Sequence, residues 1–322
     1  MTMERKNQTS SVSEFILLGL SSKPEDQMPL FVLFLTMYLI TITGNLLIIL
    51  AIHFNPQLQT PMYFFLSFLS FTDICFTTTV VPKMLENILS EKKTISYAGC
   101  LTQMYFIYAL GNSDSCLLAV MAFDRYVAIC DPFHYVTTMN HRRCIFLVAF
   151  SCSFPHLHSL LHILLLNSLT FCDSNVIHHF LCDINPLLKL SCSSIYVNEI
   201  IIMSEGPIVL VTPFLCIAFS YMRILITVLN IPSASGKRKA FSTCGSHLTV
   251  VTLFYGSIYH EYVAHGSIYY EYLHPLSSYT ARDRVATIVY TVLSSMLNPF
   301  IYSLRNKDLK RGLGKLMGSK KA

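Results

Sequence analysis

Seven long apolar stretches constrain the fold of this chain more than any other feature. A helix needs roughly 20 residues to cross about 30 Å of hydrocarbon, and each stretch reaches that length. Backbone N–H and C=O groups inside lipid must be paired within their own segment, which favours helices over open strands. We therefore predict an all-α membrane protein, a seven-transmembrane helix bundle with spans at residues 28–52, 60–82, 98–123, 143–166, 199–229, 240–264 and 285–304.

The composition excludes a water-soluble domain. Only 13% of the 322 residues are charged and 53% are hydrophobic, whereas about 25% of residues are charged in soluble domains. The first 26 residues contain no apolar core, so we expect no cleavable signal peptide and a first span that directs insertion. We expect three parts: an extracellular N-terminus at 1–27, the transmembrane domain at 28–304 and a cytoplasmic tail at 305–322.

The distribution of positive charge predicts the orientation. With the N-terminus outside, the inner segments carry 14 of the 23 Lys and Arg residues and the outer segments carry nine. This excess agrees with the rule that cytoplasmic loops are rich in Lys and Arg. A glycosylation acceptor at Asn7 also requires an outside N-terminus. The net charge of +5 lies mostly on this inner rim, and it favours lipid headgroups and a cytosolic partner over nucleic acid.

Residues Met121–Cys130 read MAFDRYVAIC and place Asp124 and Arg125 at the end of a long apolar run. Charges at such a position are costly unless they lie at the membrane edge or pair with each other. The pair is therefore a functional hypothesis. The alternative is an ion-paired helix terminus that has no further role.

Other motifs follow in a fixed order along the spans: Gly44-Asn45, Pro61–Leu66 (PMYFFL) with Asp73, Met121–Cys130, Ser220-Tyr221, Lys239–Cys244 (KAFSTC) with His247, and Asn298–Tyr302 (NPFIY). Together they resemble the odorant (olfactory) receptors of the rhodopsin-like G-protein-coupled receptor family, over Glu14 to Leu316. The resemblance implies a plasma-membrane receptor, not an enzyme. It would bind small volatile organic ligands within the bundle and activate a heterotrimeric G protein of the olfactory stimulatory type, which raises cyclic AMP.

Two other classes of protein lack their signatures in the sequence. A transporter would show inverted repeats or paired broken helices, and the only internal repeat here is ten residues long. An intramembrane enzyme would need a nucleophile and a base at matching depth, and the sequence has no nucleophile elbow, phosphate loop or zinc-protease motif.

Four cysteines are expected on the outer side. Cys172, Cys182 and Cys192 lie in the long loop after the fourth span, and Cys100 begins the third span. The outer compartment is oxidising, and four cysteines allow three connectivities. The resemblance implies the pairs Cys100–Cys182 and Cys172–Cys192.

The resemblance also implies a switch at the inner side. Arg125 would pair with Asp124 at rest and swing towards Tyr221 and the cytosolic partner on activation, with Tyr126 and Tyr302 in the same switch. Pro299 removes a backbone hydrogen bond and gives the seventh helix a place to bend.

Asp73 and Asp114 are the only acidic residues deep in the apolar spans. By resemblance they face each other near Asn45 and Asn298. Two close carboxylates cannot both ionise cheaply, so either one holds a proton or a cation lies between them. The prediction is a sodium site that favours the resting state. The alternative is a hydrogen-bonded polar core without an ion, and no other cofactor is expected.

Helical spacing back from Asp124-Arg125 places a ligand pocket in the outer half of the bundle. Its predicted members are mostly apolar, with a few hydroxyls and an amide, which suits a small volatile molecule. They are Ile107, Tyr108, Gly111, Asn112, Ser115, Ile202, Glu205, Gly206, Val209, Tyr255, Ile258, Tyr259, Tyr262, Ile288 and Thr291. Glu205 suits an amine ligand, with a solvated outer-edge carboxylate as the alternative, and aromatic residues at this spacing also occur in ordinary packing.

Two histidine groups have spacings that metal ligands can have. His179 lies near Cys182 and Asp183, but a disulfide-bonded Cys182 would be unable to bind a metal. His158 and His162 share one face of the fourth span, where we expect a packing or loop-facing role rather than a metal site.

A tandem repeat departs from the family pattern. Residues 256–265 (GSIYHEYVAH) and 266–275 (GSIYYEYLHP) are identical at six of ten positions. Ten residues of helix turn about 80° short of three full turns, so a continuous helix would present the copies on different faces. We expect the first copy to finish the sixth helix and the second to enlarge the third outer loop. A receptor that misfolds or no longer signals is the alternative.

A short amphipathic helix is predicted after the seventh span. Leu309, Leu313, Leu316 and Met317 recur at helical spacing, with Lys or Arg between them. Such a segment lies on the inner leaflet with its apolar side in the lipid. The alternative is a disordered basic tail.

Overall fold

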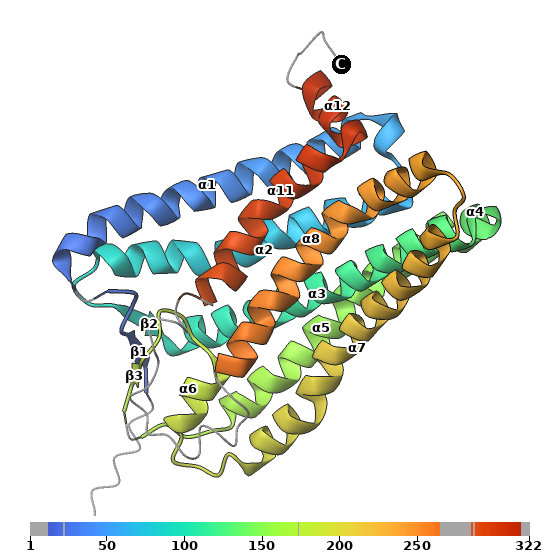
Figure 1. Ribbon diagram of the computed structural model, residues 1–322. Coiled ribbons are helices and arrows are strands. Elements are labelled where there is room, and N and C mark those ends of the chain that lie inside the picture. Colours follow the sequence, from blue (N-terminus) through green and yellow to red (C-terminus); the bar gives the residue numbers. More distant parts are fainter. Residues whose placement is uncertain (1–11, 22, 173, 265–284, 286, 317–322) are drawn as a thin grey trace, which may run out of the picture.

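The structure is a computed structural model that describes residues 12–316, apart from 22, 173, 265–284 and 286. Its long helices pack as a bundle (Figure 1). They are α1 (Pro24–Phe54), α2 (Pro61–Leu89), α3 (Tyr97–Cys130), α5 (His141–Asn167), α7 (Tyr196–Leu229), α8 (Ala234–Ala264), and the run of η3 (Val289–Leu293) and α11 (Ser294–Arg305).

These helices confirm the predicted seven-transmembrane bundle. Among the described residues, α1, α2, α3, α5 and α7 are each long and apolar enough to cross a membrane. The predicted spans 240–264 and 285–304 correspond to α8 and to the run of η3 and α11. Short elements occupy the loops: η1 (Pro56–Leu58), η2 (Pro132–His134), α4 (Tyr135–Thr138) and α6 (Ile184–Lys189).

The helices differ in how much of their surface the bundle covers. Over the most apolar 18-residue segment of each helix, 61% of the segment is buried inside the bundle in α3 but only 11% in α7. Helix α3 lies between α2, α5, α7 and α8 (Figure 1). Residues on α7 such as Leu215 and Phe219 are exposed on the outside of the bundle and suit a lipid environment.

A small sheet closes one end of the bundle, which we call the outer end (Figure 1). Strand β1 (Glu14–Leu17) pairs antiparallel with β2 (Thr94–Ser96) and parallel with β3 (Val176–Ile177). Phe15 and Leu17 are fully buried beneath the loops. The sequence predicts only helices, so these three strands are additional elements that tie the N-terminal segment to two outer loops.

Two disulfides join the outer loops. One links Cys100 to Cys182 with a Cα–Cα distance of 5.5 Å, and the other links Cys172 to Cys192 at 6.0 Å. Both distances lie in the usual range for disulfides. This is the pairing that the resemblance implies. The first bridge fastens the loop between α5 and α7 to the start of α3, and the second closes that loop on itself.

An amphipathic helix, α12 (Lys307–Leu316), follows α11 at the inner end, as the sequence predicts (Figure 1). Leu309 is fully buried, whereas Lys310 and Arg311 are exposed. Asn306 begins the helix because its Oδ1 accepts hydrogen bonds from the backbone N–H groups of residues 308 and 309, both at 3.1 Å. The same oxygen accepts a bond from the Tyr63 hydroxyl at 2.9 Å, which joins α12 to the start of α2.

Most of the first repeat copy is helical. Helix α8 continues to Ala264, one residue short of the end of the copy at residue 265. That the first copy finishes the sixth helix stays a prediction, because residues 265–284 lie outside the described residues. The second copy (266–275), the glycosylation acceptor Asn7 and Met317 lie outside the described residues.

Candidate functional site

Helices α3, α7 and α8 meet in the outer half of the bundle. The hydroxyls of Ser115 on α3 and Tyr255 on α8 lie 2.6 Å apart, and both side chains are buried. The ring of Phe214 on α7 lies 5.2 Å from the Tyr255 ring. Closer to the outer end, the Tyr108 hydroxyl donates a 2.5 Å hydrogen bond to Asp183 of the outer loop. These contacts place hydroxyl groups in an otherwise apolar region.

Several predicted pocket residues face this region or the η3 segment beside it. Gly111 packs so closely against the Tyr290 side chain that a Cβ at this position would collide with its hydroxyl. Asn112 is half-buried and makes no side-chain hydrogen bond to any described residue. The remaining members of this group are Ile107, Ile258, Ile288 and Thr291, each buried or half-buried.

The predicted pocket residues on α7 are placed differently. Ile202 packs against the outer apolar cluster that contains Leu101, and Gly206 has open space beside its Cα. Val209 is half-buried on the same helix. Glu205 faces His158 and His162 of α5 rather than Tyr255. The side chains of Tyr259 and Tyr262 lie outside the described residues.

A polar cluster occupies the centre of the bundle. Asn298 on α11 donates a 2.8 Å hydrogen bond to Asp73 on α2, and the Thr72 hydroxyl donates to Asp114 on α3. Both carboxylates are at least 95% buried and line one cavity, together with Ser294 and Ser295. The cavity has room for about one particle the size of a water molecule.

The ligand atoms around this cavity are suited to a cation. Carboxylate, hydroxyl and amide oxygens are hard ligands, and two buried carboxylates bring an excess of negative charge. The structure brings both aspartates to one cavity with Asn298, the arrangement that the resemblance implies. Asn45 lies nearby in the chain's polar core, where its Nδ2 donates to the Ser295 carbonyl at 3.1 Å. Next to it, Gly44 allows close approach of α11, because a Cβ there would lie 3.1 Å from Pro299.

A π-helical turn, η3, leads directly into α11. Such turns are rare and frequently mark functional sites. Tyr290 in this turn packs against Phe76 at 5.5 Å and Phe254 at 5.9 Å, which connects α2, α8 and the seventh segment above the polar cluster.

The inner end holds Arg125 in an ion pair. Arg125 Nη2 and Nε lie 2.6 and 3.0 Å from Oδ2 of Asp124, whose side chain is fully buried. The Tyr135 hydroxyl donates to the other Asp124 oxygen at 2.8 Å. Burial raises the pKa of Tyr135, and the Asp124 carboxylate raises it further, so this hydroxyl keeps its proton and remains the donor. Asp124 is thus bound on both sides.

The Tyr221 hydroxyl contacts His247 rather than Arg125, whose ion-pair partner is Asp124. This hydroxyl lies 2.8 Å from Nδ1 of His247 on α8, and the two rings stack. Nε2 of His247 lies 3.1 Å from the Leu118 carbonyl of α3. Because a carbonyl can only accept, Nε2 carries the proton and Nδ1 accepts from Tyr221. His247 therefore joins α3, α7 and α8 in one contact.

The remaining residues of the predicted switch, Tyr302 and Tyr126, also lie at the inner end of the bundle. Tyr302 is buried, and its hydroxyl has no hydrogen-bond partner among the described residues. Tyr126 is half-buried and packs against the apolar cluster of Ile224, Val228 and Cys244. The sequence indicates His247 only as part of a motif. Its role depends on a partner 129 residues away, which no local signal reveals.

The ligand-like spacing of His179, Cys182 and Asp183 does not form a metal site through the cysteine, as expected for a disulfide-bonded Cys182. Cys182 is disulfide-bonded, so its sulfur cannot act as a thiolate ligand. His179 is buried instead, where Nδ1 accepts from the Leu181 backbone N–H at 3.3 Å and Nε2 lies 3.4 Å from the Thr287 hydroxyl.

The bundle and its inner contacts define a seven-helix membrane receptor of the rhodopsin-like fold. The crystal structure of squid rhodopsin matches with a TM-score of 0.72 at 20% sequence identity, over 92% of this chain and 81% of that one. A family profile described as "Olfactory receptor" matches residues 34–320. The chain belongs to the olfactory receptor family, multi-pass membrane proteins that detect odorants through G-protein signalling and are not enzymes.

Two curated human relatives match over almost the whole chain. Olfactory receptor 1L8 of Homo sapiens is 80% identical over 318 residues, which covers 99% of this chain and 100% of that relative. Olfactory receptor 1L1 of Homo sapiens is 68% identical and covers 98% of this chain and 85% of that relative.

Proposed function

We propose that a small volatile odorant binds between α3, α7 and α8, next to Ser115 and Tyr255. The region is apolar and offers hydroxyls and the Asn112 amide, which has no hydrogen-bond partner among the described residues, and this suits a ligand oriented by one or two hydrogen bonds. In this proposal the outer sheet and disulfides lie outside the plasma membrane, and residues 305–322 form the cytoplasmic tail.

The proposed mechanism rests on one observation: α8 contacts both the proposed ligand site, through Tyr255, and the proposed switch, through His247. Tyr255 binds Ser115, and His247, eight residues earlier, binds Tyr221 and Leu118. Eight residues of helix span about 12 Å. A ligand that replaces the Ser115–Tyr255 bond shifts α8, and the shift breaks the His247 contacts and frees Tyr221 for Arg125. This is a two-state element that a ligand biases.

The partner in this proposal is a heterotrimeric G protein of the olfactory stimulatory type. Two apolar side chains of the second inner loop protrude from the inner end, Phe133 with 96% of its surface exposed and Val136 with 80%. The basic residues Lys237, Arg238 and Lys239 lie at the start of α8, where anionic lipids or an acidic partner surface can bind.

A cyclic-AMP screen with a mixed odorant panel tests this function. We expect the full chain and a variant that lacks residues 256–265 both to reach the cell surface, and at least one odorant to raise cyclic AMP. If the repeat is harmful, the deletion responds more strongly. An unchanged or weaker response means that the repeat is tolerated or used, whereas no response by either surface-expressed chain contradicts the function.

We also propose that sodium binds between Asp73 and Asp114 and favours the resting state. Sodium should raise the midpoint of thermal unfolding of the purified receptor relative to N-methylglucamine, because a ligand at ten times its Kd stabilises by about 1.4 kcal/mol. Asp73→Asn and Asp114→Asn should remove this difference. Asp131→Asn, in an inner loop, is the control and should keep it. An equal sodium effect in all four proteins would contradict the ion site and favour a hydrogen-bonded core.

A further inference from the structure

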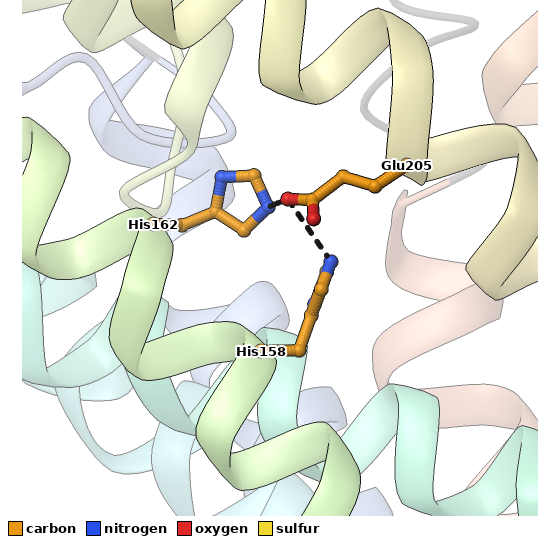
Figure 2. A group of neighbouring side chains, drawn as sticks. All are labelled: His158, His162 and Glu205. Atoms are coloured by element: carbon orange, nitrogen blue, oxygen red, sulfur yellow. Dashed lines mark ion pairs between the residues drawn. The ribbon is translucent and has the colours of Figure 1, made fainter.

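Two histidines of α5 and a glutamate of α7 face one another in the outer half of the bundle (Figure 2). Oε1 of Glu205 lies 2.8 Å from Nε2 of His162 and 3.4 Å from Nε2 of His158. His158 and His162 are one helical turn apart, so they project from the same side of α5, and their ring centroids lie 4.7 Å apart.

This group is buried and incompletely bonded. The two histidine side chains are 9% and 8% exposed, and that of Glu205 is 27% exposed. Both ring nitrogens of His158 are buried without a hydrogen-bond partner among the described residues. Buried polar atoms are nearly always hydrogen-bonded, so an imidazole that has, in the described part of the chain, only a 3.4 Å contact to a carboxylate indicates a missing ligand.

The spacing of the three residues matches metal coordination. One ligand atom from each lies within 4.8 Å of the other two. In a tetrahedral zinc site the metal–ligand distances are about 2.0–2.2 Å, which places ligand atoms about 3.3 Å from one another. The two distances to Glu205 bracket this value, so small side-chain movements bring the three ligand atoms to this spacing.

We propose that His158, His162 and Glu205 bind a zinc-class divalent ion that bridges α5 and α7. Imidazole nitrogens together with one carboxylate suit zinc, whereas calcium and magnesium prefer sites made of oxygen ligands. Three protein ligands leave a fourth position for water. Glu205 is the most exposed of the three, so the ion enters from its side.

The bridge has a structural consequence because α7 is the least buried of the five apolar spanning helices. His162 lies five residues before the end of α5, and Glu205 lies nine residues after the start of α7. The ion therefore fixes the outer part of α7 against α5, roughly 8–14 Å below the outer ends of these helices. The neighbouring residues on α7, Ile202 and Gly206, belong to the predicted ligand pocket.

Zinc alone, added to purified full-length receptor in lipid nanodiscs with a histidine-free tag, tests the site. We expect zinc, but not magnesium, to raise the midpoint of thermal unfolding, because an ion that binds only the folded state stabilises it. His162→Asn and Glu205→Gln should raise the zinc concentration that gives half of this shift by about ten-fold or more, as loss of metal-site interactions does. His162→Cys keeps a ligand and should retain the shift.

His156→Asn is the matched control. This histidine lies on the same helix but binds the Tyr105 hydroxyl at 2.9 Å and is not part of the cluster. Its zinc response should equal that of the unsubstituted receptor. If a variant does not fold, the cobalt absorption spectrum of the unsubstituted receptor decides: tetrahedral visible bands support the site, and their absence overturns it. An equal zinc response in His162→Asn, Glu205→Gln and the unsubstituted receptor also overturns it.

Discussion

Substitution of Arg125 by alanine should abolish odorant-evoked cyclic AMP when the signal is expressed per receptor at the cell surface. Arg125 is held by Asp124 in this structure, and in the proposed mechanism the release of that ion pair makes a charged side chain available at the inner end. An alanine at this position has no guanidinium group that could leave Asp124 and reach the partner. Surface amount is measured by antibody against an N-terminal tag, and cyclic AMP by a luminescent reporter, with a loss of about ten-fold or more expected.

Two variants separate signalling from folding. Arg125→Ala leaves Asp124 buried with Tyr135 as its remaining partner, and breaking a buried pair destabilises a protein by about 3–5 kcal/mol. The double variant Asp124→Asn/Arg125→Ala removes both charges and should restore any lost surface amount without restoring cyclic AMP. Arg142→Ala, an exposed residue at the same end, should signal normally. Cyclic AMP that persists in Arg125→Ala would remove Arg125 from the switch.

Hydropathy predicts the bundle well because length and apolarity are local properties. The seven spans and the amphipathic α12 can be located from single stretches of sequence, whereas the cluster of Asp73, Asp114 and Asn298 is implied only by the family resemblance. The four-residue strand β1 cannot, because it is too short to show the alternation of a half-buried strand. Its stability comes from two outer loops that are distant in sequence.

The contacts between helices are the least predictable part of the site. Helices α1 and α5 are apolar on nearly all sides, since lipid and neighbouring helices both accept apolar residues. Their rotation about their own axes is therefore not visible in the pattern of the sequence. For this reason Glu205 is predicted in a ligand pocket but faces His158 and His162. The partners of His247 remain hidden for the same reason.

Loss of the disulfide between Cys100 and Cys182 should reduce surface expression to about one-tenth or less. The bridge joins residues 82 apart in sequence and fixes the loop that carries Asp183, the partner of Tyr108. A crosslink over roughly this length removes about 4–5 kcal/mol of chain entropy from the unfolded state, which is much of the stability of a typical protein. Surface antibody staining of Cys100→Ser and Cys182→Ser measures the effect.

The comparison with the other cysteines identifies the cause. The bridge between Cys172 and Cys192 closes a shorter loop of 20 residues, so its loss removes only about 3 kcal/mol and should lower surface expression less. The double variant Cys100→Ser/Cys182→Ser leaves neither partner of this bridge as an unpaired thiol and should be as poorly expressed as either single variant. Cys216→Ser, at an exposed free cysteine on α7, should be expressed normally. Normal surface levels of Cys182→Ser would show that packing of the outer sheet and loops holds this end of the bundle without the crosslink.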